Sequence, residues 1–203
     1  MEILVATGNA GKIRELKRHL DDLPVKLRGL SEFSHIVEVE ETGATFAENA
    51  LLKAKSYALQ TNLWSLADDS GLKAAALGGA PGVFSARYGG ANATDEENIE
   101  KLLNELNKKP QSERSARFVC AMAICDASGE LKYAAEAVCT GTIAVTPTGT
   151  NGFGYDPIFI PDGFEQTFGE LSTEIKQKIS HRARAVEKII DYLRAFTALS
   201  LDQ

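Results

Sequence analysis

The amino-acid sequence predicts an α/β protein in which helices flank a long mixed β-sheet. An apolar strand at 3–6 leads through a small-residue turn into a helical pattern at 12–21, and this order is typical of the class. Two long alternating segments, 116–126 and 131–145, are separated by an Asp-Ala-Ser-Gly turn, which predicts an antiparallel hairpin. A last helix at 181–198 carries an apolar stripe.

The first third of the chain alternates short strands with helices. Residues 3–6 (ILVA) are continuously apolar, as in a buried strand, and Ile13, Leu16 and Leu20 share one face of the helix that follows. The further elements expected here are strands at 25–27, 36–39 and 63–67 and a helix at 45–60.

Two glycine-rich loops interrupt the rest of the chain. The stretch 77–90 (LGGAPGVFSARYGG) predicts a long structured loop, and 149–157 (GTNGFGYDP) predicts a second one. Between them, a helix at 94–107 begins with a capping box. Ser180 is the expected N-cap of the last helix.

The composition is that of a globular protein. The chain has 203 residues, 44% hydrophobic and 25% charged, which suits one domain or two small lobes with a shared core. Its net charge of −6 argues against nucleic-acid binding, which needs a basic surface. Short apolar runs and the lack of an export signal predict no membrane association and a cytoplasmic location. The cysteines form no C-x-x-C pair and are expected to be core thiols: Cys120, Cys125 and Cys139.

The turn TGNAGK at 7–12 lies between a strand and the N-terminus of a helix. Such a terminus presents N–H groups and a favourable dipole to a phosphate. Gly8 and Gly11 allow close approach of the backbone, and Lys12 adds a positive charge. The turn is not a Walker A motif, because only two residues separate its glycines and Ile13 replaces the Ser/Thr. Taken alone, it fits a phosphate cradle and an ordinary turn equally well.

Two acidic pairs, Glu40-Glu41 and Asp68-Asp69, each follow a predicted strand directly. Mg²⁺ prefers oxygen ligands and keeps much of its water, so one or two carboxylates plus substrate phosphates suffice to bind it. A solvated loop is the alternative for each pair. We also expect Asp68 to crowd Asp69 and so to raise its proton affinity.

Three further features fit a nucleotide ligand. Lys53 shares a helix face with Asn49, where it is either solvated or directed at a phosphate. His181 and Arg182 lie in the first turn of the last helix, where cations oppose the helix dipole, which indicates an anionic or carbonyl partner. The segment 153–156 (FGYD) offers an aromatic platform for a base, or else packs its aromatic ring on the core.

Taken together and in this order, these motifs resemble the inosine triphosphate pyrophosphatase family, especially its bacterial branch that acts on dITP and XTP. The resemblance runs from residue 6 to residue 185, nearly the whole chain. It is carried by the segments ATGNAGKIREL, EETGATFAENALLKA, ADDSGL, LGGAPGVFSARY, GFGYDPIF and ISHRARA.

The resemblance implies an elongated two-lobed fold around the long mixed sheet, with the active site in the cleft between the lobes. Residues 1–203 would form a single domain that assembles as a homodimer. The implied activity is that of a hydrolase of nucleotide metabolism with Mg²⁺ as cofactor. It would cleave non-canonical purine nucleoside triphosphates (ITP, dITP, XTP) into the monophosphate and pyrophosphate.

The resemblance also implies roles for individual residues. Asp69 would be the proton acceptor, and Glu40 and Asp69 would hold the metal, with Glu41 as a substitute for Glu40. The mechanism that we expect from these roles adds Lys12 and Lys53, which would stabilise the departing pyrophosphate. The other substrate contacts would be made by Thr7, Gly8, Asn9, Ala10, Gly11, Ser70, Phe153, Gly154, Tyr155, Asp156, Lys176, His181 and Arg182.

Base selection has a chemical rationale. Hypoxanthine and xanthine present a 6-oxo acceptor where adenine presents an amino donor, so Arg182 or Lys176 at that edge would favour the first two; a polar mismatch of this kind discriminates by roughly 10⁴-fold or more. Two alternatives stay open: a pyrophosphatase of different base preference, and a nucleotide sensor without catalysis. The four acids count against the sensor, because binding a polyanion gains nothing from them without a metal.

Overall fold

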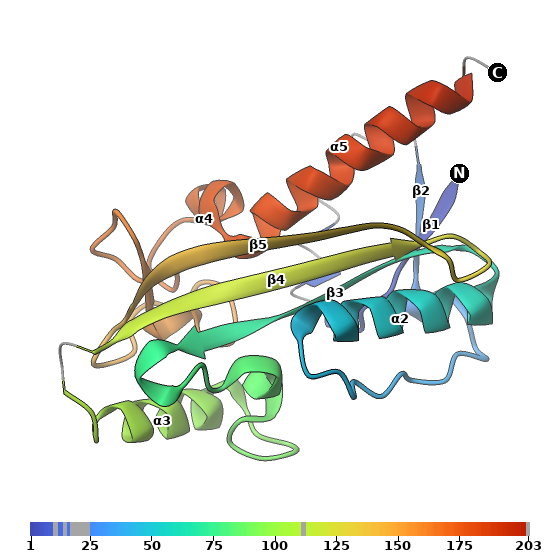
Figure 1. Ribbon diagram of the computed structural model, residues 1–203. Helices are drawn as coiled ribbons and strands as arrows, with labels where there is room; N and C mark the ends of the chain where they lie inside the picture. The colour runs from blue at the N-terminus through green and yellow to red at the C-terminus, as the bar shows by residue number, and fades with distance from the viewer. Residues whose placement is uncertain (10–11, 14–15, 17–24, 111–112, 202–203) are drawn as a thin grey trace. The chain divides into compact units, whose positions relative to one another are not determined.

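A six-stranded sheet in the order β2-β1-β3-β4-β5-β6 frames the protein in a computed structural model that describes residues 1–9, 12–13, 16, 25–110 and 113–201 (Figure 1). The strands are β1 (Glu2–Val5), β2 (Lys26–Gly29), β3 (Trp64–Ala74), β4 (Ser115–Cys125), β5 (Leu131–Ile143) and β6 (Phe159–Pro161). The helices are α2 (Phe46–Thr61), α3 (Asp95–Leu106), α4 (Thr173–Ile179) and α5 (His181–Leu201). Short 3-10 helices lie at η1 (Leu30–Glu32), η2 (Ala75–Leu77), η3 (Gly82–Arg87) and η4 (Asp156–Ile158).

The strand directions make the sheet mixed. β1 pairs in parallel with β2 and with β3, so that Leu4 lies between Arg28 and Ser65. β5 pairs antiparallel with β6. β4 and β5 are neighbours in the sheet, and the turn that joins them bonds Gly129 N–H to the Asp126 carbonyl at 2.9 Å. The predicted α/β class with a mixed sheet and flanking helices is confirmed.

The chain folds into two compact units, in agreement with the two lobes expected. Unit 1 comprises Met1–Asp69, Cys120–Ala137 and Ala183–Gln203, and unit 2 comprises Ser70–Val119 and Val138–Arg182. The three long strands, β3, β4 and β5, each run from one unit into the other. The description of the chain as one domain with a cleft between its lobes stays a prediction.

Each unit has an apolar core of its own. In unit 1, Val186, Ile189 and Leu193 on the inner face of α5 join a core that includes β-sheet residues such as Ile3 and Met122, and the predicted stripe of the last helix is therefore confirmed for these residues. The unit 2 core contains three aromatic rings, with centroids 4.7 Å apart for Phe118–Phe159 and 5.3 Å for Phe159–Phe168. All three cysteines are buried and unbridged, as predicted.

The expected end of the strand 63–67 was wrong. β3 continues to Ala74, so Asp68 and Asp69 lie inside a strand and not in a loop after it. The strand interior accepts these acids because a lysine ammonium lies close to each of them: Lys12 beside Asp68, and Lys53 beside Asp69.

The strand expected at 36–39 does not form. Side chains of α2 take up the backbone groups that a sheet neighbour would have used. Gln60 accepts the Val37 N–H at 2.7 Å and donates to the Val37 carbonyl at 3.1 Å, while the Tyr57 hydroxyl accepts the Val39 N–H at 3.3 Å. Glu40 and Glu41 therefore follow a coil segment that is bonded to a helix.

The helix boundaries agree more closely with expectation. α5 begins at His181, directly after Ser180 in extended conformation, as an N-cap requires. The helix expected at 12–21 is described only at residues 12, 13 and 16, which are helical; Leu20 lies outside the described residues. The short α4 and β6 were not expected.

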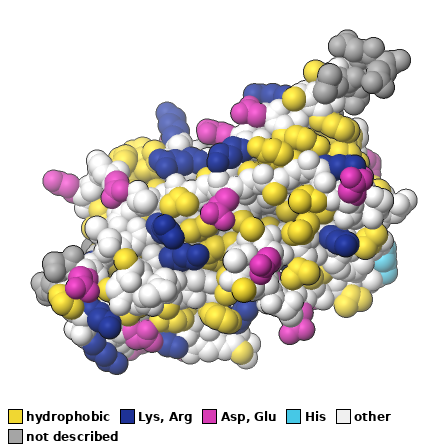
Figure 2. Space-filling view, viewed as in Figure 1, with side chains coloured by type: hydrophobic (Ala, Val, Ile, Leu, Met, Phe, Trp, Pro, Cys, Tyr) yellow, Lys and Arg dark blue, Asp and Glu magenta, His cyan; other side chains and the backbone are white. Residues whose placement is uncertain are grey.

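On the face shown in Figure 2, the described acidic and basic side chains are interspersed with apolar ones. Each helix that the structure describes is too short or too polar to cross a membrane.

Candidate active site

Two consecutive carboxylates of β3 form the centre of the candidate site in unit 1. Asp68 is 1% exposed and Asp69 is 6% exposed, so both are buried. Successive side chains of a strand point to opposite faces. The structure accordingly places a different lysine beside each carboxylate.

Lys12 is the partner of Asp68. Its Nζ lies 2.9 Å from Asp68 Oδ2. The turn before Lys12 is held by Asn9, whose Oδ1 accepts the Lys12 N–H at 3.1 Å, as an N-cap residue does. Gly8, in the same turn, has open space where a Cβ would stand. The predicted phosphate turn thus has a helix start beside a buried acid; Ala10 and Gly11 lie outside the described residues.

Lys53 lies between two other acids. It projects from α2, and its Nζ is 2.5 Å from Glu41 Oε1 and 4.0 Å from Asp69 Oδ1. Burial alone would lower the pKa of Lys53, but the surrounding carboxylates, Asp68 first, outweigh burial and raise it. This ammonium is therefore a firmly protonated cation between two acids.

The pKa of the Asp69 carboxyl is raised, as predicted, but not for the predicted reason. Burial is the main cause, and Glu41 adds to it, while Lys53 and Asn49 act in the opposite direction. Asn49 is fully buried and donates from Nδ2 to Asp69 Oδ2 at 3.0 Å. Crowding by Asp68 was the wrong explanation, since that side chain pairs with Lys12.

The two glutamates of the first acidic pair differ in their surroundings. Glu41 is beside Lys53, whereas Glu40 is exposed. The structure thus brings together Lys53, Asp69 and Glu41, and the expectation that named Glu40 is neither confirmed nor contradicted.

The predicted base-binding residues gather in unit 2. Lys176 Nζ lies 2.6 Å from Asp156 Oδ2 and 5.0 Å from the centroid of the Phe153 ring. The same Asp156 oxygen accepts the Phe153 N–H at 2.8 Å. A Cβ at Gly152 would lie 2.0 Å from that oxygen, so the tight turn requires glycine there.

Arg182 joins the same group of residues. Its Nη2 donates to Ser70 Oγ at 2.8 Å, and its guanidinium carbon lies 5.5 Å from the Phe153 ring centroid. The neighbouring His181 stacks on Phe118, with centroids 4.6 Å apart and planes at 6°. Residues far apart in the chain thus form one cluster, which includes a basic pair at the start of α5.

Two residues that the sequence did not single out support the loop at 153–156. Asp95, the first residue of α3, accepts the Gly154 N–H at 2.6 Å. The Ser85 carbonyl accepts the Tyr155 hydroxyl at 2.8 Å. An acid in the first turn of a helix fits an ordinary capping role, so no signal in the sequence distinguished Asp95.

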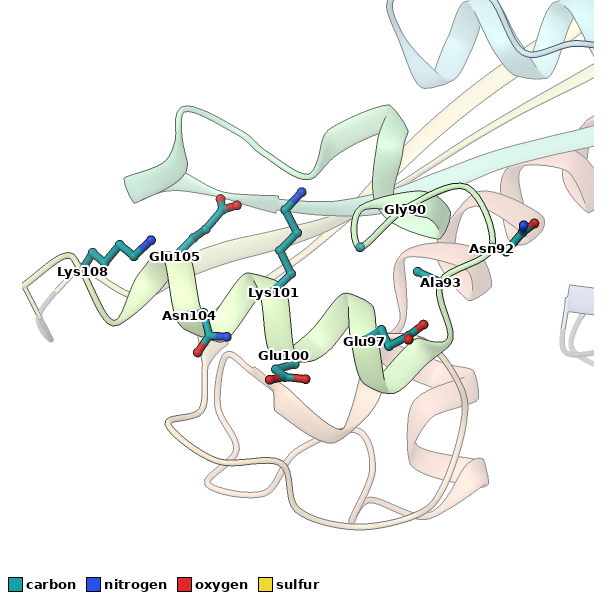
Figure 3. Close-up of a pocket in the computed structure, with 10 residues that line it drawn as sticks. Gly90, Asn92, Ala93, Glu97, Glu100, Lys101, Asn104, Glu105 and Lys108 are labelled. Atoms are coloured by element: carbon teal, nitrogen blue, oxygen red, sulfur yellow. The ribbon is translucent and has the colours of Figure 1, made fainter.

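A hollow of about 550 Å³ lies elsewhere in unit 2, over α3 (Figure 3). Two of its charged side chains bond to the backbone: Lys101 donates to the Tyr88 carbonyl at 2.7 Å, and Glu97 accepts the Thr94 N–H at 2.7 Å. None of the expected site residues is among those that line it. The expected site residues therefore lie away from this hollow, in two groups that belong to different units. In unit 1 they are the carboxylates of β3 with their lysines. In unit 2 they form a group that we name the Phe153–Arg182 cluster, made of Ser70, Phe153, Asp156, Lys176, His181 and Arg182.

The donor set on β3 fits a divalent cation completed by phosphate oxygens. The part of the chain that the structure describes holds no cluster of three or more His, Cys, Asp and Glu side chains suited to a metal. A hard cation that keeps its waters needs only one or two carboxylates beside a phosphate. Lys53 shows that the space between Glu41 and Asp69 accommodates positive charge.

Comparison with known proteins identifies the family. The model of the Ham1 family matches residues 3–192. The chain belongs to the Ham1 family. The resemblance inferred from the motifs is thereby confirmed. Among curated proteins, a dITP/XTP pyrophosphatase of Geobacter sulfurreducens is 49% identical over 191 residues, covering 94% of this chain and 96% of the relative. One of Bacillus licheniformis is 47% identical over 188 residues, covering 93% and 95%.

Solved structures of the Ham1 family share the fold. A HAM1 protein from Coxiella burnetii superposes with a TM-score of 0.88 at 44% identity, covering 98% of this chain and 99% of that one. A nucleoside-triphosphatase / dITP/XTP pyrophosphatase from Mycobacterium abscessus gives a TM-score of 0.77 at 44% identity, covering 93% and 97%.

Proposed function

We propose that this Ham1 protein hydrolyses ITP, dITP and XTP to the monophosphate and pyrophosphate, and so removes them from the nucleotide pool. The observation that carries the proposal is identity of nearly half, over nearly the full length, to relatives named dITP/XTP pyrophosphatase. The lysine–carboxylate pairs on β3 supply the chemistry that such a reaction needs.

The turn at 7–12 holds the triphosphate in this proposal. Thr7, Asn9 and the helix N–H groups donate to phosphate oxygens. Lys12 and Lys53 stabilise the negative charge on the departing pyrophosphate. Before substrate arrives, Lys12 is paired with the buried Asp68 and Lys53 with the half-buried Glu41. Electrostatic groups fixed in place before the reaction are the usual source of rate enhancement in phosphoryl transfer.

Asp69 is the proposed general base. It takes a proton from water while the water oxygen forms a bond to the α-phosphorus and the α–β bridging bond breaks, which releases pyrophosphate. Its raised pKa suits this task, because an ordinary aspartate is a weak base. A positioned base of this kind contributes about 10²–10⁴-fold to the rate.

Asp69 and one carboxylate of the Glu40-Glu41 pair are the proposed holders of Mg²⁺. The resemblance assigns Glu40, while the geometry favours Glu41, whose carboxylate is on the Lys53–Asp69 side. When bound, a magnesium ion neutralises phosphate charge and polarises the phosphorus centre.

The Phe153–Arg182 cluster is the proposed base and sugar site. Phe153 offers its ring to the base, and the cationic groups of Lys176 and Arg182, which lie near that ring, donate to the 6-oxo group. Ser70, Gly154, Tyr155, Asp156 and His181 complete it. Adenine would leave these buried donors unsatisfied, which costs roughly 10⁴-fold or more in specificity.

We further propose that the protein acts as a cytoplasmic homodimer without nucleic-acid or membrane partners. Light scattering of the purified protein at several concentrations tests the dimer, and a monomeric mass at all of them would contradict it.

The function is tested by measuring pyrophosphate release from ITP, dITP, XTP, ATP and GTP with Mg²⁺. We expect turnover of the first three and little of ATP. Equal turnover of ATP contradicts the specificity, and tight binding without turnover of any triphosphate favours a nucleotide sensor.

A further inference from the structure

We propose that Asn49 is a positioning residue that fixes the Asp69 carboxylate relative to the Glu40–Gly43 segment. The inference rests on the proposed function, because it assigns Asn49 to the orientation of the metal-binding and base carboxylates. Asn49 has no contact with the reacting atoms in this proposal and acts through Asp69.

The amide of Asn49 bonds two segments that are distant in the sequence. Its Oδ1 accepts the Gly43 N–H at 2.7 Å, and its Nδ2 donates to Asp69 Oδ2 at 3.0 Å. Asn49 is 0% exposed, so water does not compete for either bond. One side chain of α2 therefore connects the turn after Glu41 to the middle of β3.

The two bonds determine which way the amide faces. A backbone N–H can only donate, so the oxygen of Asn49 must face Gly43 and the nitrogen must face Asp69. That nitrogen holds Asp69 Oδ2. The other oxygen, Oδ1, is the one directed toward Lys53, at 4.0 Å. Asn49 thus selects which carboxylate oxygen is presented to the cations and the attacking water.

The turn at Gly43 is built for this contact. A Cβ at Gly43 would lie 2.7 Å from Asn49 Oδ1 and 2.7 Å from Glu48 Cβ, so only glycine approaches α2 this closely. The capping box of α2 anchors the next residues, since Glu48 Oε2 accepts the Ala44 N–H at 2.7 Å and Thr45 Oγ1 accepts the Glu48 N–H at 3.2 Å. The segment that carries Glu41 is therefore fixed to the start of the helix.

Asn98 provides a matched control in unit 2. It is 2% exposed, its Oδ1 accepts the Gly89 N–H at 2.7 Å, and its Nδ2 donates to the Ala86 carbonyl at 3.3 Å. Both asparagines are thus buried, and each bonds a glycine N–H. They differ in that Asn49 donates to a carboxylate and Asn98 donates to a backbone carbonyl.

The experiment compares Asn49→Ala with Asn98→Ala in the full-length protein. Urea unfolding measures stability; kcat and KM for ITP are measured with Mg²⁺. Electron paramagnetic resonance measures Mn²⁺ binding in the presence of a non-hydrolysable α,β-methylene analogue of ITP. We expect both variants to lose stability. Only Asn49→Ala should lose kcat and Mn²⁺ affinity, by about 10–100-fold, because partners that orient metal ligands have effects of this size.

We expect the KM of Asn49→Ala for ITP to stay within about threefold of the wild-type value. A fall in kcat with little change in KM is the pattern expected when an interaction with the transition state is removed. Equal kcat and Mn²⁺ affinity per folded molecule in the two variants would overturn the proposal. If Asn49→Ala does not fold, Asn49→Asp keeps the size and the acceptor for Gly43 but loses the donor. Its kcat should then fall at least about tenfold, with Asn98→Asp as control, and an unchanged kcat overturns the proposal.

The two proposals fail separately. A wild-type protein that releases no pyrophosphate from any triphosphate contradicts the proposed function. The difference in Mn²⁺ binding between wild type and Asn49→Ala still reports on Asn49 in that case, because it does not depend on turnover.

Discussion

Lys176 Nζ lies 2.6 Å from Asp156 Oδ2, and the two side chains are only 9% and 3% exposed. The ion pair is buried beside the Phe153 ring, and the same Asp156 oxygen accepts the Phe153 N–H. Lys176, which is proposed to contact the nucleotide base, therefore also supports the Phe153 ring.

Breaking this pair should destabilise the protein strongly. Asp156→Asn still accepts the Phe153 N–H but leaves the Lys176 ammonium buried without its counter-charge. Removing one partner of a buried pair costs about 3–5 kcal/mol in the free energy of unfolding, which urea denaturation measures. The exposed Glu165→Gln serves as control and should stay within about 0.5 kcal/mol. A loss below about 1 kcal/mol for Asp156→Asn would show that the pair is solvated.

Arg182 should matter more for binding than for turnover. Arg182→Ala removes the donor to Ser70 and the cation near Phe153, and we expect KM for ITP to rise much more than kcat falls. Arg182→Lys keeps the charge but not the planar fork of donors, so it should restore only part of the loss. A large fall in kcat with unchanged KM would remove Arg182 from base recognition.

The two glutamates are separable by their effect on the metal requirement. Because Glu41 is on the Lys53–Asp69 side and Glu40 is exposed, Glu41→Gln should raise the Mg²⁺ concentration for half-maximal activity by about tenfold or more, and Glu40→Gln should raise it less. A magnesium titration at saturating ITP measures both. A larger increase for Glu40→Gln than for Glu41→Gln would contradict this prediction and support Glu40 as the metal ligand, as the resemblance implies.

Asp69→Asn should abolish turnover and yet stabilise the metal-free protein. The folded-state pKa of Asp69 is raised above its ordinary value of 3.8, mainly by burial, so ionising the carboxylate disfavours the folded state. In the wild type, ionising Asp69 lowers the free energy of unfolding. This destabilisation is absent below the ordinary pKa, grows between the ordinary and the folded-state pKa, and is constant at higher pH. Thermal unfolding in a chelator should therefore give Asp69→Asn the higher Tm at pH 8 and an equal Tm near pH 3. A lower Tm for Asp69→Asn than for the wild type at pH 8 would mean that Lys53 and Asn49 stabilise the ionised Asp69 more than burial destabilises it.

The long amphipathic and apolar elements were predictable because their signals are local. The stripe of α5 and the capping box of α3 depend on residues three or four apart, and the structure has them where expected. The strand prediction at 36–39 was wrong because Ile36, Val37 and Val39 are β-branched and apolar, as in a strand. The side chains that bond its backbone, Gln60 and Tyr57, lie about 20 residues away in the sequence.

The candidate site was predictable in its residue types but not in its pairings. Lys12 and Lys53 were expected to face phosphates; only the tertiary structure shows that they also neutralise Asp68, Asp69 and Glu41. Asn49 had one visible signal, its shared helix face with Lys53. Its bond to Asp69 spans 20 residues, which no local pattern encodes.

The most direct test of the central claim is steady-state pyrophosphate release from ITP, dITP, XTP, ATP and GTP with Mg²⁺, measured for the wild type and for Asp69→Asn. The account predicts efficient release from ITP, dITP and XTP, little from ATP, and none above background for Asp69→Asn. Equal release from ATP, or a fully active Asp69→Asn protein, would contradict it.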